Sequence, residues 1–145
     1  MITVMSFPPG PILRAIERAS GKSTSHITLA TFDDDAYEKV RASVFSASCV
    51  HEPCLATIEG VACFPSSKSG WSVSLAIRSE GLEVFRRSIG CGARLPMLHM
   101  SVFKSSGVLD IEETLSDLMG LRFLVDATNI CSDDGRMERF RFCRF

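Results

Sequence analysis

Two short segments each place a histidine two residues before a hydroxyl inside an apolar run: "HITL" at 26–29 and "HMSV" at 99–102. The chain has only three histidines, and two of them are in this setting. Imidazole titrates near neutral pH, so one ring can be neutral and act as a base while the other is protonated and acts as an acid. These residue types suit the cleavage of a phosphodiester bond, and this chemistry requires no metal ion.

The spacing within each segment favours a shared surface for its two polar side chains. Both segments belong to apolar runs that are typical of β-strands, in which residues i and i+2 point to the same face. His26 therefore shares a face with Thr28, and His99 shares one with Ser101. Hydroxyl groups donate hydrogen bonds to phosphoryl oxygens, so Thr28 and Ser101 are the candidate phosphate ligands.

The elements that must position these residues occur in the same order twice. The first set has strands at 2–7, 26–32 and 54–64, with helices at 11–19 and 33–45 between them. The second set has strands at 71–78, 97–104 and 121–131, with helices at 79–90 and 109–120 between them. A final strand follows at 136–145. The polar segment 65–70 reads as a linker. This order predicts an α+β fold with two lobes, approximately 1–65 and 71–145, related by a pseudo-two-fold axis. We expect the two sheets to face a shared central groove, with the histidine strands brought together across it.

The bulk composition limits the class of protein. The 145 residues are enough for one domain, and 46% hydrophobic with 23% charged residues is typical of a globular protein. A formal net charge of −1 excludes an overall field that recruits nucleic acid or a membrane. The sequence shows no signal peptide and no apolar run of membrane-spanning length. We therefore expect a soluble, cytoplasmic protein with no membrane partner.

The cysteines do not have the spacing of a metal site. No CxxC pair occurs, and no second ligand pair lies at a zinc-like distance, so zinc is not expected. Free thiols are expected in an intracellular protein. The third histidine, His51, reads as an ordinary surface residue. The six cysteines are Cys49, Cys54, Cys63, Cys91, Cys131 and Cys143.

The two motifs resemble the paired His-x-Thr/Ser-x signature of the 2H phosphoesterases, the LigT-like group. The resemblance covers nearly the whole chain. "IEGVACF" at 58–64, the polar loop and "WSVSLAI" at 71–77 are similar to the segment that joins the two lobes of that family. "DGRMERFRF" at 134–142 is similar to its final hairpin. The compact length is similar to that of viral and phage members.

The resemblance implies a phosphodiesterase that needs no metal and no cofactor. It assigns His26 and His99 as the acid/base pair and Thr28 and Ser101 as the phosphate ligands. The expected partner is a nucleotide or short oligonucleotide, with no obligate protein partner. We expect 2′-linked or cyclic substrates, such as 2′-5′ oligoadenylate or the cyclic oligonucleotide messengers of immunity; a viral member would then act in immune evasion in the host cytoplasm.

Three alternatives remain open from the sequence. The first is a 2′,3′-cyclic phosphodiesterase or an enzyme that processes RNA ends. The second is a sponge that binds nucleotides without cleaving them. The third is a structural α/β protein whose histidines are incidental.

Several aromatic residues are candidate base contacts. By strand parity, Phe32 and Phe103 share the faces of the motif residues, where a phenyl ring can stack on a base. They also suit core positions at the strand ends. Trp71, the single tryptophan, suits either a wall of the groove or a structural anchor. The arginines interleaved with phenylalanines at 136–145 suit nucleotide contact or the solvated face of an edge strand.

Overall fold

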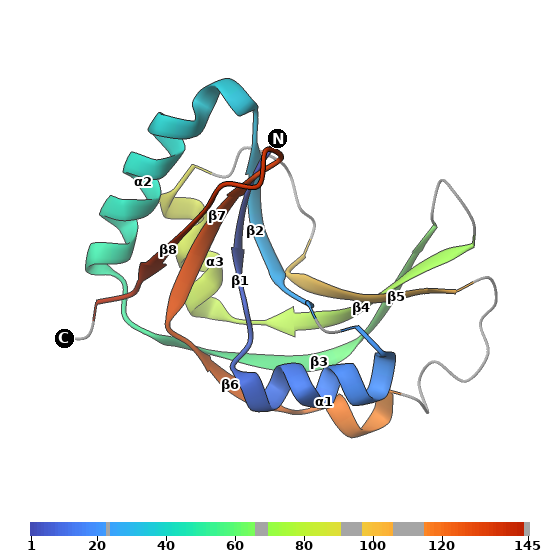
Figure 1. Cartoon of the computed structure of the whole chain (residues 1–145). Coiled ribbons are helices and arrows are strands. Elements are labelled where there is room, and N and C mark those ends of the chain that lie inside the picture. The colour runs from blue at the N-terminus through green and yellow to red at the C-terminus, as the bar shows by residue number, and fades with distance from the viewer. Residues whose placement is uncertain (23, 66–69, 91–96, 106–114, 144–145) are drawn as a thin grey trace.

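The computed structural model of the chain describes residues 1–22, 24–65, 70–90, 97–105 and 115–143 (Figure 1). Its helices are α1 (Gly10–Ser20), α2 (Tyr37–Val50) and α3 (Glu80–Ser88), with short 3-10 turns η1 (Asp34–Ala36) and η2 (Ser116–Leu118). Its strands are β1 (Ile2–Ser6), β2 (Ile27–Phe32), β3 (Cys54–Pro65), β4 (Trp71–Arg78), β5 (His99–Ser105), β6 (Arg122–Val125), β7 (Ala127–Ser132) and β8 (Met137–Arg141).

Within the described residues, the strands form one antiparallel sheet in the order β6-β3-β4-β5-β2-β1-β7-β8. The predicted α+β class and the duplicated arrangement are confirmed, because β2-β1-β7-β8 on one side of the centre correspond to β5-β4-β3-β6 on the other. The expectation of two sheets facing each other needs correction. β2 and β5, the two histidine strands, are hydrogen-bonded neighbours at the centre of a single sheet.

Each half of the sheet takes strands from both halves of the chain. β3 lies beside β4, and the two pair as a long hairpin from Thr57 with Arg78 to Pro65 with Trp71. β7 and β8, from the end of the chain, continue the sheet from β1 instead. The division of the sequence at 65–71 is therefore not a division of the sheet, because β3 and β4, which lie on either side of it, pair with each other.

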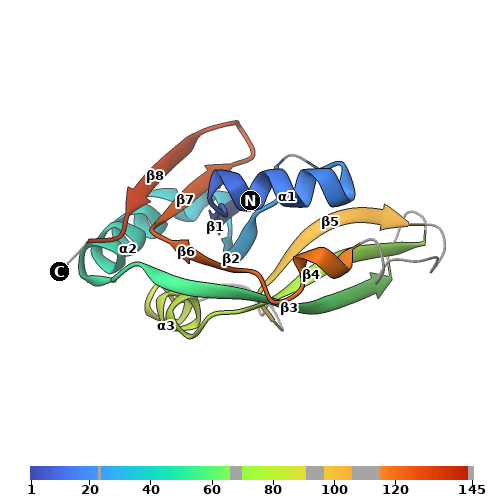
Figure 2. The ribbon, with the colours of Figure 1, turned by 90° about the horizontal axis from the view of Figure 1, so that it is seen from below.

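The sheet is strongly curled. β6 pairs with β3 at one edge, whereas β7 pairs with β1 and β8 near the other edge. Asp126 alone separates β6 from β7, and Cα atoms two residues apart lie at most about 7.6 Å from each other. The two ends of the sheet must therefore approach each other, which gives a half-barrel (Figures 1 and 2). The predicted single strand at 121–131 is wrong, since it is split at Asp126.

The helices follow the sequence signals with small shifts. α3 begins at Ser79, whose hydroxyl accepts a hydrogen bond from the Leu82 amide at 3.2 Å, as the predicted cap requires. α1 ends at Gly21, which has a positive φ of 77°. α2 extends to Val50, five residues beyond the predicted end. Part of the predicted helix at 109–120 lies outside the described residues.

One buried apolar cluster joins the three helices to the sheet. Ile16 of α1, Val44 of α2 and Phe85 of α3 all belong to it and have no exposed surface. The described cysteines are all free. None of the described helices has both the length and the hydropathy needed to span a membrane.

Candidate active site

The register between β2 and β5 determines which side chains meet at the centre of the sheet. Ile27 lies opposite Met100, and both side chains are fully buried in the core. In antiparallel strands the residues on either side of such a pair point to the opposite face. The histidine and the hydroxyl of each motif therefore lie on the face away from this part of the core, as their spacing predicts.

On that face, each histidine lies opposite the hydroxyl residue of the other motif. Continuing the register by one residue in each direction places His26 opposite Ser101 and Thr28 opposite His99. Directly opposite residues of antiparallel strands have Cβ atoms about 4.5–5.5 Å apart. All four side chains are half-buried. The structure thus brings the four predicted residues together as a cluster of two imidazoles and two hydroxyls.

Both imidazoles are held by the same kind of backbone contact. His26 Nδ1 lies 3.3 Å from the Thr24 carbonyl oxygen, and His99 Nδ1 lies 3.1 Å from the Met97 carbonyl oxygen. A carbonyl oxygen only accepts hydrogen bonds, so Nδ1 must carry the hydrogen in each contact. In a neutral ring this leaves Nε2 as the basic nitrogen, and in a protonated ring it leaves Nε2–H as the donor.

Burial is the main influence on the pKa of His26. It lowers this pKa from the ordinary value of 6.5, because a charged imidazole is poorly solvated there. The hydrogen bond to the Thr24 carbonyl raises the pKa, while the positive charges of Lys22 and His99 lower it further. The net decrease favours a neutral His26 at pH 7.

A β-bulge ends each motif at its fourth residue. The pairing of β2 with β1 skips Leu29, and the pairing of β5 with β4 skips Val102. Both side chains are buried, at 0% and 1% exposed. An extra residue in a strand shifts the alternation of faces beyond it. The two motifs thus share their local backbone irregularity as well as their residue types.

The parity prediction for Phe32 is wrong for this reason. Beyond the bulge at Leu29, Phe32 lies opposite the fully buried Ile2 of β1 and packs against the hydrophobic core. It borders a pocket formed by α2 and the C-terminal end of α3, and it does not share the face of His26. Phe103 and Trp71 lie on β5 and β4, but their side chains are outside the described residues, so those two predictions stay untested.

Two other phenylalanines lie beside the imidazoles. The ring centroids of Phe7 and His26 are 5.9 Å apart, and those of Phe64 and His99 are 5.7 Å apart. Both phenyl rings are half-buried. The sequence analysis missed Phe64 because it placed 54–64 in the other lobe, whereas the β3–β4 hairpin brings it near β5. Phe7 could have been found from the pairing of the strands at 2–7 and 26–32.

His51 is a packed residue rather than an ordinary surface one. Its ring centroid lies 5.3 Å from that of Phe85 and 4.7 Å from that of Phe142. Its Nε2 atom lies 2.9 Å from the Gly81 carbonyl oxygen. This histidine therefore joins the end of α2 to α3 and takes no part in the central cluster.

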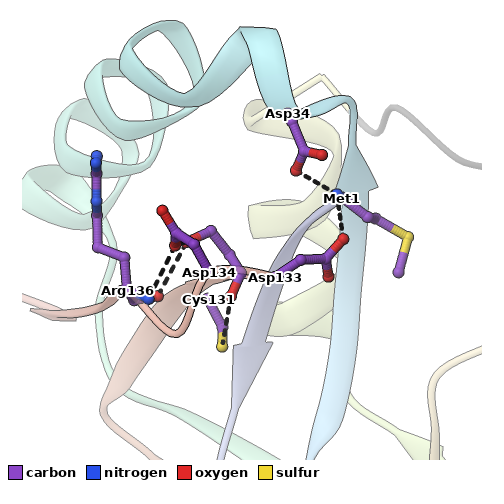
Figure 3. A network of polar contacts seen from close by, with 7 residues as sticks. Met1, Asp34, Cys131, Asp133, Asp134 and Arg136 are labelled. Carbon is purple, nitrogen blue, oxygen red and sulfur yellow. Dashed lines mark hydrogen bonds and ion pairs between the residues drawn. The ribbon is translucent and has the colours of Figure 1, made fainter.

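Asp34, the middle one of three consecutive aspartates at 33–35, belongs to a separate polar network (Figure 3). Asp34 and Asp133 accept hydrogen bonds from the Met1 amine, the latter at 2.6 Å. Asp134 accepts one from the Arg136 amide at 3.1 Å. This network lies at the end of β1 remote from His26. Met1 is six residues from Phe7, the neighbour of His26, which corresponds to about 20 Å of extended chain at about 3.3 Å per residue. Among the described residues, no three His, Cys, Asp or Glu side chains are grouped as in a metal site.

The arginine-rich end of the chain forms the edge strand β8. Its two described phenylalanines are buried, with Phe140 9% and Phe142 4% exposed, while Arg139 is exposed and lies 3.7 Å from Asp126. The described part of this segment thus has the features of an edge strand with a solvated basic face.

Comparisons with known proteins identify the fold. No family model matches the sequence, and no curated protein matches it. The structure matches TT0787 of Thermus thermophilus at 14% identity and a TM-score of 0.70, covering 97% of each chain. It matches Escherichia coli LigT complexed with NADP+ at 14% identity and a TM-score of 0.68, covering 99% of this chain and 95% of LigT. The structure also matches LigT complexed with 3′-AMP at 15% identity and a TM-score of 0.67, again covering 99% of this chain and 95% of LigT. The predicted LigT-like fold is confirmed.

Proposed function

We propose that the protein is a phosphodiesterase that acts on a nucleotide or oligonucleotide without a metal ion, using His26 and His99 as its acid/base pair. The observation that carries this proposal is the central cluster of the sheet. Each imidazole has its Nδ1 engaged by a carbonyl oxygen, and each lies opposite a hydroxyl residue of the other motif. The remaining Nε2 atoms are the two groups available for proton transfer.

The chemistry needs one neutral and one protonated ring. The neutral imidazole takes a proton from the attacking hydroxyl or water through Nε2, and the protonated one gives its Nε2 proton to the leaving oxygen as the P–O bond breaks. The lowered pKa of His26 favours it as the base and leaves His99 as the acid. Thr28 and Ser101 donate hydrogen bonds to the non-bridging phosphoryl oxygens and stabilise the charge that develops on them.

The substrate class that we propose is a 2′-linked or cyclic nucleotide or oligonucleotide. The solved structures of LigT with NADP+ and 3′-AMP support nucleotide binding in this fold. Half-buried phenyl rings next to both histidines support it further, because an aromatic ring stacks on any base. The runner-up is cleavage of 2′,3′-cyclic phosphates or processing of RNA ends, which uses the same acid/base pair.

A cleavage panel in EDTA tests the function. It contains 2′-5′ oligoadenylate, 3′-5′ RNA, 2′,3′-cyclic nucleotides, and cyclic di- and trinucleotides. Wild type should cleave one class, with a bell-shaped pH dependence around neutrality. His26→Ala and His99→Ala should each lower kcat/KM about 10²- to 10⁴-fold, because each removes one proton-transfer group.

The matched control is His51→Gln. It changes the third histidine, preserves a donor for the Gly81 carbonyl, and should leave kcat/KM unchanged. A strict requirement for added divalent metal, or full activity in either alanine variant, would contradict the proposed mechanism. Tight nucleotide binding with no turnover of any substrate would identify a sponge instead.

A further inference from the structure

Ser74 of β4 extends the polar cluster by one strand. It lies directly opposite Ser101, which in turn lies opposite His26, so the three side chains form a row across β4, β5 and β2. The neighbours of Ser74 along the strand, Val73 and Leu75, are fully buried in the core. By alternation, Ser74 points to the same face of the sheet as the histidines.

The Ser74 hydroxyl is buried and has no partner. The residue is 1% exposed, and its Oγ makes no hydrogen bond within the part of the chain that the structure describes. Buried hydroxyl groups in native proteins are nearly always hydrogen-bonded, so an orphan one requires an explanation. Ser74 is too deeply buried to touch a substrate. Ser101 is the hydroxyl residue directly opposite it on β5, where Cβ atoms are about 4.5–5.5 Å apart, and the two hydroxyls are not hydrogen-bonded to each other in this structure.

The two hydroxyl residues of the site have different neighbours. Thr28 lies opposite Met5 of β1, an apolar side chain that is 7% exposed, whereas Ser101 lies opposite the hydroxyl of Ser74. A threonine carries a γ-methyl group that restricts its χ1 rotamer. A serine lacks this group, and its Oγ has three staggered positions available. Ser101 therefore needs another means of fixing its hydroxyl.

We propose that Ser74 is a positioning residue that donates its hydroxyl hydrogen to Ser101 Oγ when a phosphoryl group binds, leaving the hydroxyl hydrogen of Ser101 for a phosphoryl oxygen. The proposal rests on the function proposed above. The hydrogen bond from Ser74 holds Ser101 in one rotamer, as the methyl group does for Thr28. It also polarises the Ser101 hydroxyl, because chains of hydrogen bonds strengthen one another.

A double-mutant cycle tests the inference with Ser74→Ala, Ser101→Thr and the double variant. Two quantities are measured: the Kd for adenosine 3′-monophosphate by calorimetry, and kcat/KM for the substrate that wild type cleaves. Ser74→Ala should weaken nucleotide binding about fivefold, the loss expected for one hydrogen bond. Ser74→Ala should cause little further loss of binding when Ser101→Thr is already present, because the new methyl group fixes the rotamer directly.

The matched control is Ser48→Ala. Ser48 is also buried, at 2% exposed, and its Oγ also lacks a partner within the described residues, but it lies on α2. Both alanine variants should be as stable as wild type or more so, and only Ser74→Ala should lose affinity. Wild-type affinity in Ser74→Ala, or a Ser74→Ala effect that is as large in the Ser101→Thr background as in wild type, would overturn the inference. If wild type binds the nucleotide but cleaves nothing, the proposed activity fails while the binding cycle still decides the role of Ser74.

Discussion

At the scale of single residues, the two imidazoles are oriented in the same way by their own backbone. The carbonyl two residues upstream engages Nδ1 in both motifs, which couples the orientation of each ring to the path of its strand. Burial, the larger effect, and the positive charge of Lys22 lower the pKa of His26, which favours this residue as the base in the proposed mechanism.

The lowered pKa of His26 predicts how stability depends on pH. Between its folded pKa and the ordinary value of 6.5, the unfolded chain binds more protons at this residue than the folded chain. Its contribution to the free energy of unfolding is therefore full above pH 6.5 and decreases as the pH falls toward the folded pKa. Urea denaturation between pH 7.5 and pH 5 should show this loss in wild type and a smaller loss in His26→Gln. An NMR titration that places the His26 pKa at or above 6.5 would refute the prediction.

The sequence was sufficient to predict which face of the sheet the motif residues share, but not which side chains lie beside them. Strand parity correctly places His26 with Thr28, because the motif lies within one regular stretch of strand. Parity fails at Phe32, because the bulge at Leu29 depends on how β1 pairs with β2. Phe64 was missed for a related reason, since its proximity to His99 depends on a hairpin that local patterns do not specify.

At the scale of elements, local signals located most helices and strands but not their partners. The start of α3 at the Ser79 cap and the end of α1 at Gly21 could be predicted from the sequence, because capping depends only on residues a few positions away. The break between β6 and β7 at Asp126 could not be predicted, because the apolar alternation continues across it. There the chain passes from one edge of the sheet toward the other. Strand order is set by long-range packing, which no single-sequence pattern contains.

The contact between α3 and β3 gives a prediction at this scale. A Cβ atom on Gly81 would lie 2.3 Å from the Cβ atom of Cys54, so a side chain has no room there. Gly81→Ala should lower the free energy of unfolding by about 1–3 kcal/mol through overpacking. Gly60→Ala is the control, because a Cβ atom there meets nothing within 4 Å. Adding Cys54→Gly should recover part of the loss, and wild-type stability of Gly81→Ala in urea denaturation would show that α3 shifts freely.

At the scale of the whole molecule, the exchange of strands makes the two halves of the chain dependent on each other. β3 belongs to the first half but pairs with β4 and β6 of the second. β7 belongs to the second half but pairs with β1 of the first. The candidate site also spans the two halves of the chain, because β2 of the first half is preceded by His26 and β5 of the second half carries His99. The proposed binding of one phosphoryl group between the two histidines would therefore require both halves.

Cutting the chain between residues 65 and 71 tests this dependence. Fragment 1–65 leaves β3 without either neighbour, and fragment 71–145 leaves β6 and one side of β7 unpaired. Unpaired strands expose backbone groups and apolar side chains, so neither fragment should fold alone by far-UV circular dichroism. Mixing the two should restore the sheet and the binding of adenosine 3′-monophosphate, as should a full-length chain nicked in place. A cooperative unfolding transition in either isolated fragment would show instead that the halves are independent lobes.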